Sequence, residues 1–329
     1  MTGMGPPRAV IADALGPIET YSLRPYDPGP PGPTDVRIRV KAAGVSFVDV
    51  LVAEGRYQAR PPVPFIPGSE CAGVVEAVGD KVDHISVGEA VVATGWSGMF
   101  ADIVNAPAQS VWPAPARLSA ETAAVVAVSY MTAWHALLDR GRLAAGETLL
   151  VLGAGGATGF AAVQIGAWLG AQVIASASSD AKRASARSGG AHAAVDSGSP
   201  GWAEAVKAAS GGKGVDVVFD PVGGEATERA FRRLGWNGRH LVVGFPAGVT
   251  ALPTNLPLLK SASLVGVNLA DLAVRAPELA RANQARVLGL AAEGVFKPVV
   301  AKTYPLDQFA LAMADAARGD RAGRIVLTP

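Results

Sequence analysis

Cysteine is almost absent from this chain of 329 residues, which contains one, Cys71. A single cysteine excludes an internal disulfide and a multi-cysteine zinc lobe, and it is typical of a protein in the reducing cytoplasm. The formal net charge is only +1, and Lys and Arg form no runs. Such a balance creates no field that would attract nucleic acid or an anionic membrane surface, so a small molecule is the expected partner.

Long apolar runs are also missing. The nearest candidate for a membrane span, residues 122–138, contains Ser129, Tyr130, Thr132 and His135 and falls short of the ~20 strongly apolar residues that cross a bilayer. We expect it to form a buried helix. The first residues lack the charged region and apolar core of a secretory signal. These absences together predict a cytoplasmic protein without a membrane anchor.

The residues that are abundant are apolar ones, at 50% of the chain against 17% charged. A chain of this length and composition is expected to build two domains or one enlarged α/β unit. Short β-branched or alternating runs bounded by glycine and proline predict an all-β, turn-rich region up to about residue 118. Ser119, a residue type that often caps helices, then precedes an Ala-rich stretch that is expected to be helical.

After this helix, apolar strand candidates alternate with helix-like stretches. The strand candidates are residues 147–154, 171–177, 215–223 and 239–248, and the clearest helix candidates are residues 159–170 and 200–212. Such alternation is typical of a parallel, doubly wound sheet. Residues 295–329 return to a strand, a helix and a closing strand, which we expect to pack on the first domain and make it discontinuous.

Three glycines at three-residue spacing follow the first of these strands and open the next helix. A dinucleotide site needs glycine there, because the chain turns sharply, the backbone approaches a pyrophosphate, and helix and strand pack closely. The anion then lies at the positive end of the helix. A tight strand-to-helix turn without a ligand is the alternative. The predicted contacts of this loop are Gly153, Gly155, Gly156, Ala157, Thr158 and Gly159.

The end of the second strand indicates which cofactor is used. NAD sites usually place an acidic residue on the ribose hydroxyl about 20 residues beyond the glycines, whereas this chain has hydroxyls and cations there. These suit the 2′-phosphate of NADPH. Asp180 could still be the missing acid or a helix N-cap, and the cations could lie on a solvated helix face. The predicted contacts are Ser176, Ser178, Ser179, Lys182 and Arg183.

Together with this loop, the segments AAGVSFVDV (42–50) and RYQARPPVPFIPGSECAGVVEAVG (56–79) give the chain its resemblance to a known family. It resembles the medium-chain dehydrogenase/reductase superfamily, and most closely the zinc-independent quinone oxidoreductase branch, over essentially its whole length. The resemblance implies an α/β protein with a β-rich GroES-like catalytic domain, residues 1–120 and 268–329. It implies a Rossmann NADPH-binding domain, a doubly wound parallel sheet, at residues 121–267.

Zinc-dependent members of the superfamily carry Cys where this chain has Ser46, and a His-Glu pair where it has Ser69 and Glu70. No spacing among the histidines offers the three or four ligands of a zinc site, so no metal is expected. The histidines are scattered along the chain: His84, His135, His192 and His240. Without a metal, hydride from NADPH must pass to an acceptor that is already electrophilic, such as a quinone or an α,β-unsaturated carbonyl.

The resemblance also implies catalytic and cofactor residues. Ser46 stands where quinone reductases commonly have Asn, Asp49 suits either a structural anchor or a proton carrier, and Tyr57 offers a hydroxyl donor or a packing ring. Further predicted cofactor contacts are Thr132, Gly223 with its neighbour Gly224, Gly244, Phe245, Pro246 and Arg324.

The resulting hypothesis is an NADPH-dependent, zinc-independent oxidoreductase that transfers hydride to quinones or related conjugated carbonyls. A reductase of enones, 2-alkenals or enoyl thioesters is the alternative, and a non-catalytic NADPH-binding protein is a further one. The residues leave open which acceptor is used and whether one or two electrons reach it. Residues 261–270 form an apolar, β-prone segment where relatives pair strands across a two-fold axis, so a homodimer is expected.

Overall fold

The computed structural model describes residues 5–58 and 60–329 and divides the chain into two compact units. The β-rich unit contains the residues up to Val128 with Arg275–Gly294 and Pro298–Pro329, and the parallel-sheet unit contains Ser129–Val274 with Val295–Lys297. The chain therefore leaves the β-rich unit after Val128, returns at Arg275 and leaves it again only for Val295–Lys297, so this unit is discontinuous. The family-domain boundaries at residues 120 and 268 remain a prediction.

The β-rich unit is built on a largely antiparallel sheet with the strand order β14-β15-β3-β4-β5-β7, and β6 pairs with β3. A separate pair, β1 and β2, is also antiparallel. The strands are β1 (Arg8–Ile11), β2 (Ser22–Pro25), β3 (Asp35–Val45), β4 (Glu70–Val78), β5 (Ala90–Thr94), β6 (Ile103–Pro107), β7 (Val111–Pro113), β14 (Val300–Pro305) and β15 (Arg324–Thr328). Alternate residues of β3, namely Val36, Ile38 and Val40, are buried, as the alternating sequence predicts.

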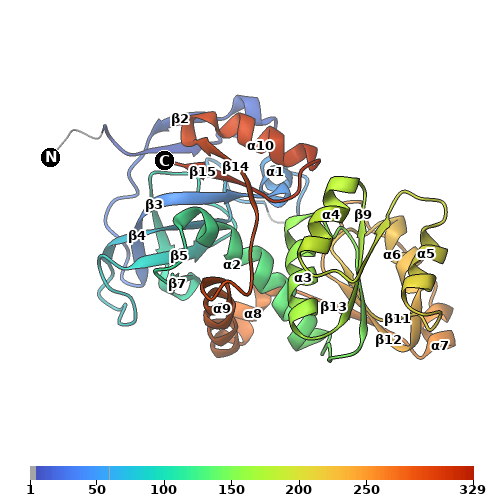
Figure 1. The fold of residues 1–329 in the computed structure, drawn as a ribbon. Coiled ribbons are helices and arrows are strands. Elements are labelled where there is room, and N and C mark those ends of the chain that lie inside the picture. The colour runs from blue at the N-terminus through green and yellow to red at the C-terminus, as the bar shows by residue number, and fades with distance from the viewer. Residues whose placement is uncertain (1–4, 59) are drawn as a thin grey trace. The chain divides into compact units, whose positions relative to one another are not determined.

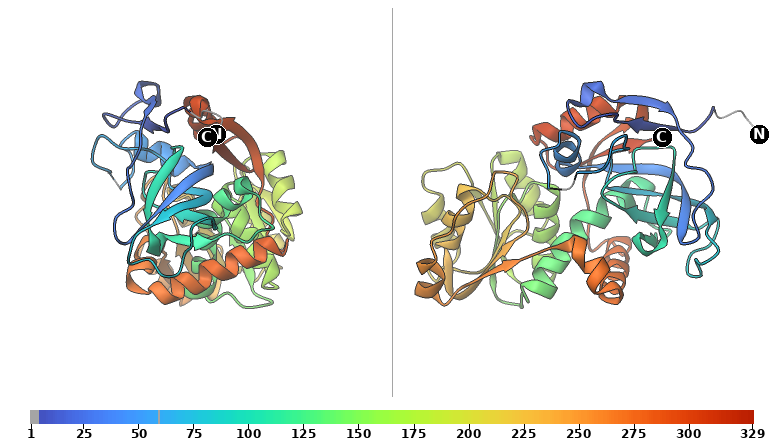
Figure 2. Two further views of the ribbon diagram at one scale, coloured as in Figure 1. Left: turned by 90° about the vertical axis from the view of Figure 1, so that its left-hand side faces the viewer. Right: turned by 180° about the vertical axis from the view of Figure 1, so that it is seen from behind.

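The C-terminal segment completes this unit. Strand β15 pairs with β3, and Figure 2 shows the red C-terminal segment beside the blue N-terminal strands of the same unit. The helices are α1 (Phe47–Ala53), α9 (Pro277–Ala292) and α10 (Phe309–Arg318). The prediction that the first 118 residues are all-β was wrong at α1, because Ser46 and Asp49 cap a helix of about two turns there.

The parallel-sheet unit confirms the predicted doubly wound sheet. Its strand order is β10-β9-β8-β11-β12-β13, all pairs are parallel, and helices lie on both faces (Figure 1). The strands are β8 (Thr148–Val151), β9 (Gln172–Ala177), β10 (Ala193–Asp196), β11 (Val215–Asp220), β12 (Leu234–Val242) and β13 (Ser263–Gly266). The helices are α3 (Ala157–Trp168), α4 (Asp180–Ser188), α5 (Trp202–Ala209), α6 (Glu225–Phe231), α7 (Asn255–Lys260) and α8 (Leu269–Arg275). In sequence order this is 3-2-1-4-5-6, the arrangement that binds dinucleotides at the carboxyl ends of its strands.

The buried helix predicted at residues 122–138 is also present. Helix α2 (Ala120–Trp134) begins after Ser119, whose hydroxyl accepts a hydrogen bond from the Thr122 amide at 3.2 Å, and it continues as a π-helical segment, His135–Arg140. Within residues 5–58 and 60–329, no helix has both the length and the apolar character that a membrane span needs.

Candidate functional site

The glycine turn between β8 and α3 has the geometry that a dinucleotide loop requires. Gly153 has a φ of +56°, in the left-handed region, and Gly156 caps α3 with extended backbone. A Cβ atom at Gly159 would lie 2.2 Å from the carbonyl oxygen of Gly153, so only glycine allows this helix to approach the strand so closely. Ala157 and Thr158 form the first turn of α3, where backbone N–H groups are available to an anion.

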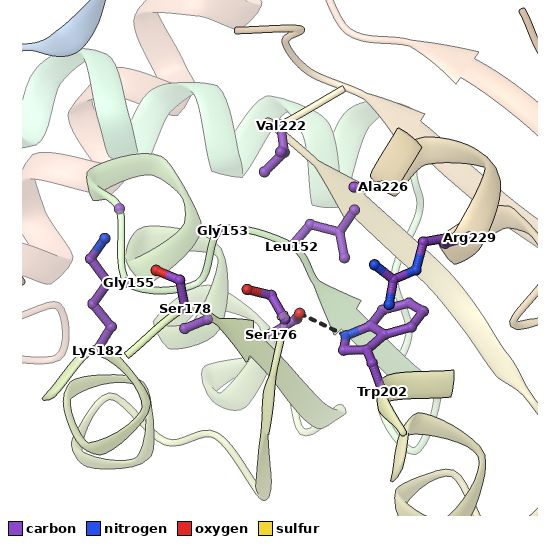
Figure 3. Close-up of a pocket in the computed structure, with 13 residues that line it drawn as sticks. Leu152, Gly153, Gly155, Ser176, Ser178, Lys182, Trp202, Val222, Ala226 and Arg229 are labelled. Carbon is purple, nitrogen blue, oxygen red and sulfur yellow. Dashed lines mark hydrogen bonds between the residues drawn. The ribbon is translucent and has the colours of Figure 1, made fainter. Parts of the chain in front are cut away.

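A pocket of about 250 Å³ opens beside this turn (Figure 3). Its lining combines small or apolar residues with hydroxyls and two cations, and none of the thirteen lining residues is an Asp or a Glu. The lining residues are Leu152, Gly153, Gly155, Gly156, Ser176, Ala177, Ser178, Lys182, Ser197, Trp202, Val222, Ala226 and Arg229. A concave site that carries only positive charge suits an anionic ligand.

Lys182 and Ser178 form one end of the pocket, beside Gly155 (Figure 3). The aliphatic stem of Lys182 lies over Gly155, where a Cβ atom would be 2.5 Å from the Lys182 Cβ and Cγ atoms. Any larger residue at position 155 would therefore displace the lysine. Six predicted contacts line the pocket together: Gly153, Gly155, Gly156, Ser176, Ser178 and Lys182.

Arg183, although next in sequence to Lys182, is engaged elsewhere. Its guanidinium lies 2.6 Å from an Asp180 carboxylate oxygen and 3.3 Å from one of Asp196, and it donates to the Ala177 carbonyl at 3.0 Å. The residue that caps α4 is Ser179, whose hydroxyl accepts from the Lys182 amide, so the N-cap role considered for Asp180 was wrong. Asp180 lies in the first turn, where its charge pairs with Arg183 instead of facing the pocket.

Two residues at the other end of the pocket escaped the sequence analysis. Trp202, at the start of α5, is buried and donates from its indole Nε1 to the Ser176 hydroxyl at 2.9 Å. The Arg229 guanidinium carbon, from α6, lies 4.9 Å from the centroid of the Trp202 ring, which is a cation–π contact. No spacing rule connects α5 and α6 to the glycine turn, so only the fold reveals them.

The two loops after β11 and β12 touch one another at the carboxyl edge of the sheet. Gly223 has a φ of +76°, and a Cβ atom there would lie 2.6 Å from the Cα atom of Phe245. Gly244 donates its amide to the Asp220 carbonyl at 3.2 Å, while Phe245 is 42% exposed. The predicted contacts outside the pocket lining are Thr132, Ala157, Thr158, Gly159, Ser179, Gly223, Gly224, Gly244, Phe245, Pro246 and Arg324, whose cofactor roles remain predictions, and Arg183. Because Arg183 is held by Asp180 and Asp196, we no longer expect it to contact the cofactor.

The catalytic candidates Ser46 and Asp49 are joined in a reciprocal cap of α1. Ser46 donates its hydroxyl to Asp49 Oδ2 at 2.6 Å and its amide to the same oxygen at 2.7 Å, while Asp49 donates its amide to Ser46 Oγ at 3.2 Å. Asp49 is buried, and burial raises the pKa of its carboxyl against the lowering effect of the Ser46 donors. These bonds account for an anchoring role, and a part in proton transfer remains a prediction.

Tyr57, the third candidate, packs against the core of the β-rich unit while part of it stays exposed. Its ring centroid lies 6.0 Å from that of Trp96, which is 49% exposed. Partial burial raises the pKa of the Tyr57 hydroxyl, so this group stays protonated and can donate a hydrogen bond at neutral pH. Of the three candidates, Tyr57 therefore has the hydroxyl best suited to meet a substrate oxygen.

Arg324 is placed against a buried acid. Its guanidinium donates to Glu70 Oε1, and the other Glu70 oxygen accepts from the Val128 amide at 2.9 Å. Both side chains are buried. Of the positions that the resemblance matched to zinc ligands, Ser46 caps α1, and Ser69 precedes Glu70, which pairs with Arg324.

Metal analysis should find no stoichiometric zinc in the purified protein, and a chelator should leave its activity unchanged. Among the described residues, no three His, Cys, Asp or Glu side chains are grouped so that they could hold a metal ion. Serine hydroxyls at positions 46 and 69 are poor zinc ligands compared with thiolate and imidazole. About one zinc per chain would contradict this prediction and would indicate alcohol or aldehyde chemistry.

Comparison with known proteins agrees with this architecture. Residues 32–116 match the alcohol dehydrogenase GroES-like domain family, and residues 157–285 match the zinc-binding dehydrogenase family. Quinone oxidoreductase-like protein 2 of Mus musculus is 34% identical over 94% of this chain and 89% of its own length. The structure of Escherichia coli quinone oxidoreductase complexed with NADPH has a TM-score of 0.90 at 28% identity, covering 98% of this chain and all of its own.

A CurK enoyl reductase structure is also similar, with a TM-score of 0.89 at 25% identity over 98% of this chain and 99% of its own. The fold, the two matched domains and these relatives agree with the resemblance inferred from the sequence. The chain belongs to the quinone oxidoreductase-like family of the medium-chain dehydrogenase/reductase superfamily, whose members are oxidoreductases that use a nicotinamide cofactor.

Proposed function

We propose that the protein is an NADPH-dependent, zinc-independent reductase of quinones or related conjugated carbonyls. The observation that carries this proposal is the pocket beside the glycine turn, which presents Lys182, Arg229 and three serine hydroxyls and no carboxylate. A carboxylate there would bind the ribose hydroxyl of NADH and repel a 2′-phosphate. The relative from Escherichia coli, which was solved with NADPH, supports the same choice.

In this proposal, the two ends of the pocket bind different parts of the adenosine half of the cofactor. Ser178 and Lys182, which both line the pocket, would hold the 2′-phosphate through charge-assisted hydrogen bonds. Trp202 and Arg229, at the other end, offer an aromatic edge and a planar guanidinium that suit a purine ring. The N-terminus of α3 and the Gly153–Gly159 backbone are left for the pyrophosphate.

When bound, the cofactor supplies a hydride, and a quinone that accepts it also takes up one proton to become a hydroquinone. The protein then needs to orient the acceptor and to provide donors for the oxygen where charge develops. Tyr57 is the residue that we propose for this donor role. Ser46 and Asp49 stabilise the start of α1, close in sequence to Tyr57, and so support this part of the β-rich unit.

If quinones are the substrates, Tyr57→Phe should lower kcat by less than about ten-fold, because a delocalised hydroquinone anion needs little stabilisation, whereas loss of an oxyanion donor typically costs about 10²-fold or more. The measurement is steady-state kcat with a quinone, a 2-alkenal and a simple ketone, and the simple ketone should not react. Tyr26, which packs partly buried against the same core, provides a matched control, and Tyr26→Phe should leave kcat unchanged.

Reduction of enones, 2-alkenals or enoyl thioesters is the second candidate, favoured by the similarity to an enoyl reductase. These acceptors form a localised enolate, which benefits from a positioned donor. Faster turnover of alkenals than of quinones, together with a large loss of kcat in Tyr57→Phe, would establish this alternative. A protein that binds NADPH but oxidises it with none of these acceptors would instead be a non-catalytic binding protein.

A homodimer is expected in solution. Strand β13 is the last strand of the parallel sheet, and its outer edge pairs with no other strand of the described chain. Leu264 on this strand is 51% exposed, and exposed strand edges tend to pair with a second copy. Light scattering at micromolar concentration should give twice the chain mass, and Leu264→Lys should shift the mass toward the monomer. A monomeric native protein with full activity would contradict this prediction.

We also propose a cytoplasmic location. The only thiol, Cys71, is buried in the core of the β-rich unit, and burial raises its pKa to about 12. A protein with no disulfide to form is compatible with a reducing compartment, and NADPH is an intracellular cofactor. Fractionation of the source cells, with the protein found in the soluble cytoplasmic fraction, tests this proposal, and recovery from an extracellular fraction would contradict it.

A further inference from the structure

A buried polar network lies under the carboxyl edge of the parallel sheet, and none of the roles above uses it. Its centre is Asp220, the last residue of β11, which is 1% exposed, and its partner His240, on the neighbouring strand β12, is fully buried. His240 Nε2 lies 3.0 Å from Asp220 Oδ2, and the Thr227 hydroxyl of α6 donates to the same oxygen at 2.6 Å. Because a carboxylate only accepts, Nε2 must carry the hydrogen.

The other oxygen of Asp220 fixes the turn that follows β11. Oδ1 accepts from the amides of Val222 and Gly223, both at 2.9 Å. Val222 lines the cofactor pocket, and its Cγ2 atom would be 3.0 Å from a Cβ atom placed on Gly153 of the phosphate-binding turn. A small shift of this turn would therefore move one wall of the pocket against another.

The main chain of Asp220 fixes the second loop, which follows β12. Its carbonyl accepts from the amides of Val243 at 2.9 Å and Gly244 at 3.2 Å. The two loops are then tied to each other, because Ala247 donates to the Val222 carbonyl at 2.9 Å and Gly224 donates to the Gly248 carbonyl at 2.7 Å. One residue thus holds both the turn that lines the pocket and the loop that carries Phe245 and Pro246.

His240 is one of two side chains that hold this carboxylate, the other being Thr227. Its ring stacks on Phe231 of α6 at 5.8 Å between centroids with an interplanar angle of 26°, so the imidazole is held in place by packing. Its Nδ1 atom is buried and has no hydrogen-bond partner within the described chain, which leaves Asp220 as the polar contact of the ring. Burial acts to raise the pKa of Asp220, but the donors from His240, Gly223 and Thr227 outweigh it and keep this pKa below its usual value.

We propose that the Asp220–His240 pair is a positioning device for the cofactor site: it holds the 221–224 turn and the 244–248 loop in one arrangement, and His240 is a positioning residue for nicotinamide cofactor binding. This inference rests on the proposed use of NADPH. It adds that cofactor binding depends on two residues that do not line the pocket. Removing the His240 donor leaves Oδ2 with the Thr227 hydroxyl alone, which loosens the 221–224 turn held by Oδ1. The 244–248 loop is affected in turn, because two backbone hydrogen bonds tie it to the 221–224 turn.

The test compares His240→Phe with His240→Gln and Asp220→Asn. Phe keeps the stacking on Phe231 but removes the donor, whereas Gln keeps an N–H near the position of Nε2. His240→Phe and Asp220→Asn should raise the Kd of NADPH by about ten-fold or more, equivalent to about 1.4 kcal/mol, whereas His240→Gln should stay within about three-fold of the native value. Titration calorimetry with NADPH and with 2′,5′-ADP, which carries only the adenosine half, provides the readout without turnover.

Asp216→Asn is the matched control. Asp216 lies at the opposite end of β11, where its carboxylate accepts from the Thr148 amide at 2.7 Å, and it does not line the pocket. This variant should lose stability but keep the Kd within about two-fold. Should His240→Phe fail to fold, Thr227→Val, which removes one donor from the same carboxylate, should still raise the Kd by about three-fold.

Native affinity in His240→Phe and Asp220→Asn, with a fall in Tm like that of Asp216→Asn, would overturn the proposal and leave the pair a purely structural one. Equal loss of affinity in His240→Gln and His240→Phe would also contradict it. Because binding is measured without an acceptor, a native protein that binds NADPH but reduces nothing would count against the proposed function alone. A native protein that does not bind NADPH would overturn both.

Discussion

Arg324→Leu is expected to lower the free energy of unfolding by about 3–5 kcal/mol, because it leaves a buried carboxylate without its cation. Glu70 is fully buried, and Arg324, which donates to it, is 7% exposed. The second oxygen of Glu70 accepts from the Val128 amide at 2.9 Å, which is a neutral donor and cannot replace the cation. Urea unfolding of the native and variant proteins measures the loss.

The loss should depend on pH in a direction that identifies its cause. Burial raises the pKa of Glu70 above its unfolded value, and the Coulombic attraction of Arg324 opposes this rise. Removing the cation raises the pKa further, so the folded variant takes up a proton more readily than the unfolded chain, and its deficit grows as pH rises. The deficit should therefore be largest at neutral pH and smaller in mild acid.

Two further variants complete this test. Combining Arg324→Leu with Glu70→Leu should recover most of the lost stability, since replacing both members of a buried pair by apolar residues is often neutral. Arg281→Leu, which breaks an exposed pair with Glu278, should change stability by less than about 1 kcal/mol. If Arg324→Leu lost no more free energy of unfolding than Arg281→Leu, the Glu70 carboxylate would not depend on Arg324 as we infer.

Lys182→Glu is expected to lower kcat/KM for NADPH by about 10²-fold and to leave NADH nearly unaffected or improved. If Lys182 holds the 2′-phosphate as proposed, the substitution removes a charge-assisted bond worth about 1.5–3 kcal/mol and places a negative charge beside the phosphate. Lys182→Ala, which removes only the attraction, should cost about ten-fold, or about 1.4 kcal/mol. Steady-state kinetics with both cofactors and one quinone measure the ratio.

Arg183→Ala is the matched control for this lysine. The two cations are adjacent in sequence, but Arg183 pairs with Asp180 and Asp196 and does not line the pocket. Its replacement should change the ratio of NADPH to NADH use by less than about two-fold. Equal effects of Arg183→Ala and Lys182→Ala, or equal use of both cofactors by the native protein, would contradict this assignment of the pocket.

Much of the parallel-sheet unit could be predicted because its strands are buried on both faces and therefore appear as apolar runs. Strands β8, β9 and β11 lie within the predicted runs, and the glycine spacing located the turn. Helix α1 was missed because it is only seven residues long and follows directly on the alternating run of β3, so it carries little helical periodicity of its own. A short helix of this kind is visible only through the Ser46 and Asp49 cap.

The candidate site was only partly predictable, for a geometric reason. Adjacent residues on a helix point about 100° apart, so Lys182 reaches the pocket while Arg183 does not, although sequence position alone makes them equivalent. Trp202 and Arg229 come from helices that follow later crossovers, and no spacing from the glycine turn identifies them. The His240 network depends on the pairing of β11 with β12, which only the folded sheet defines.

We expect the protein to use a cofactor held in the cationic pocket to reduce conjugated acceptors. The most direct measurement is the absorbance of NADPH after mixing with the protein and a series of quinones, 2-alkenals and simple ketones. We expect protein-dependent loss of this absorbance with quinones, slower loss with NADH in place of NADPH, and none with simple ketones. Binding of NADPH without oxidation by any acceptor, or turnover of simple alcohols and ketones that requires zinc, would contradict the account.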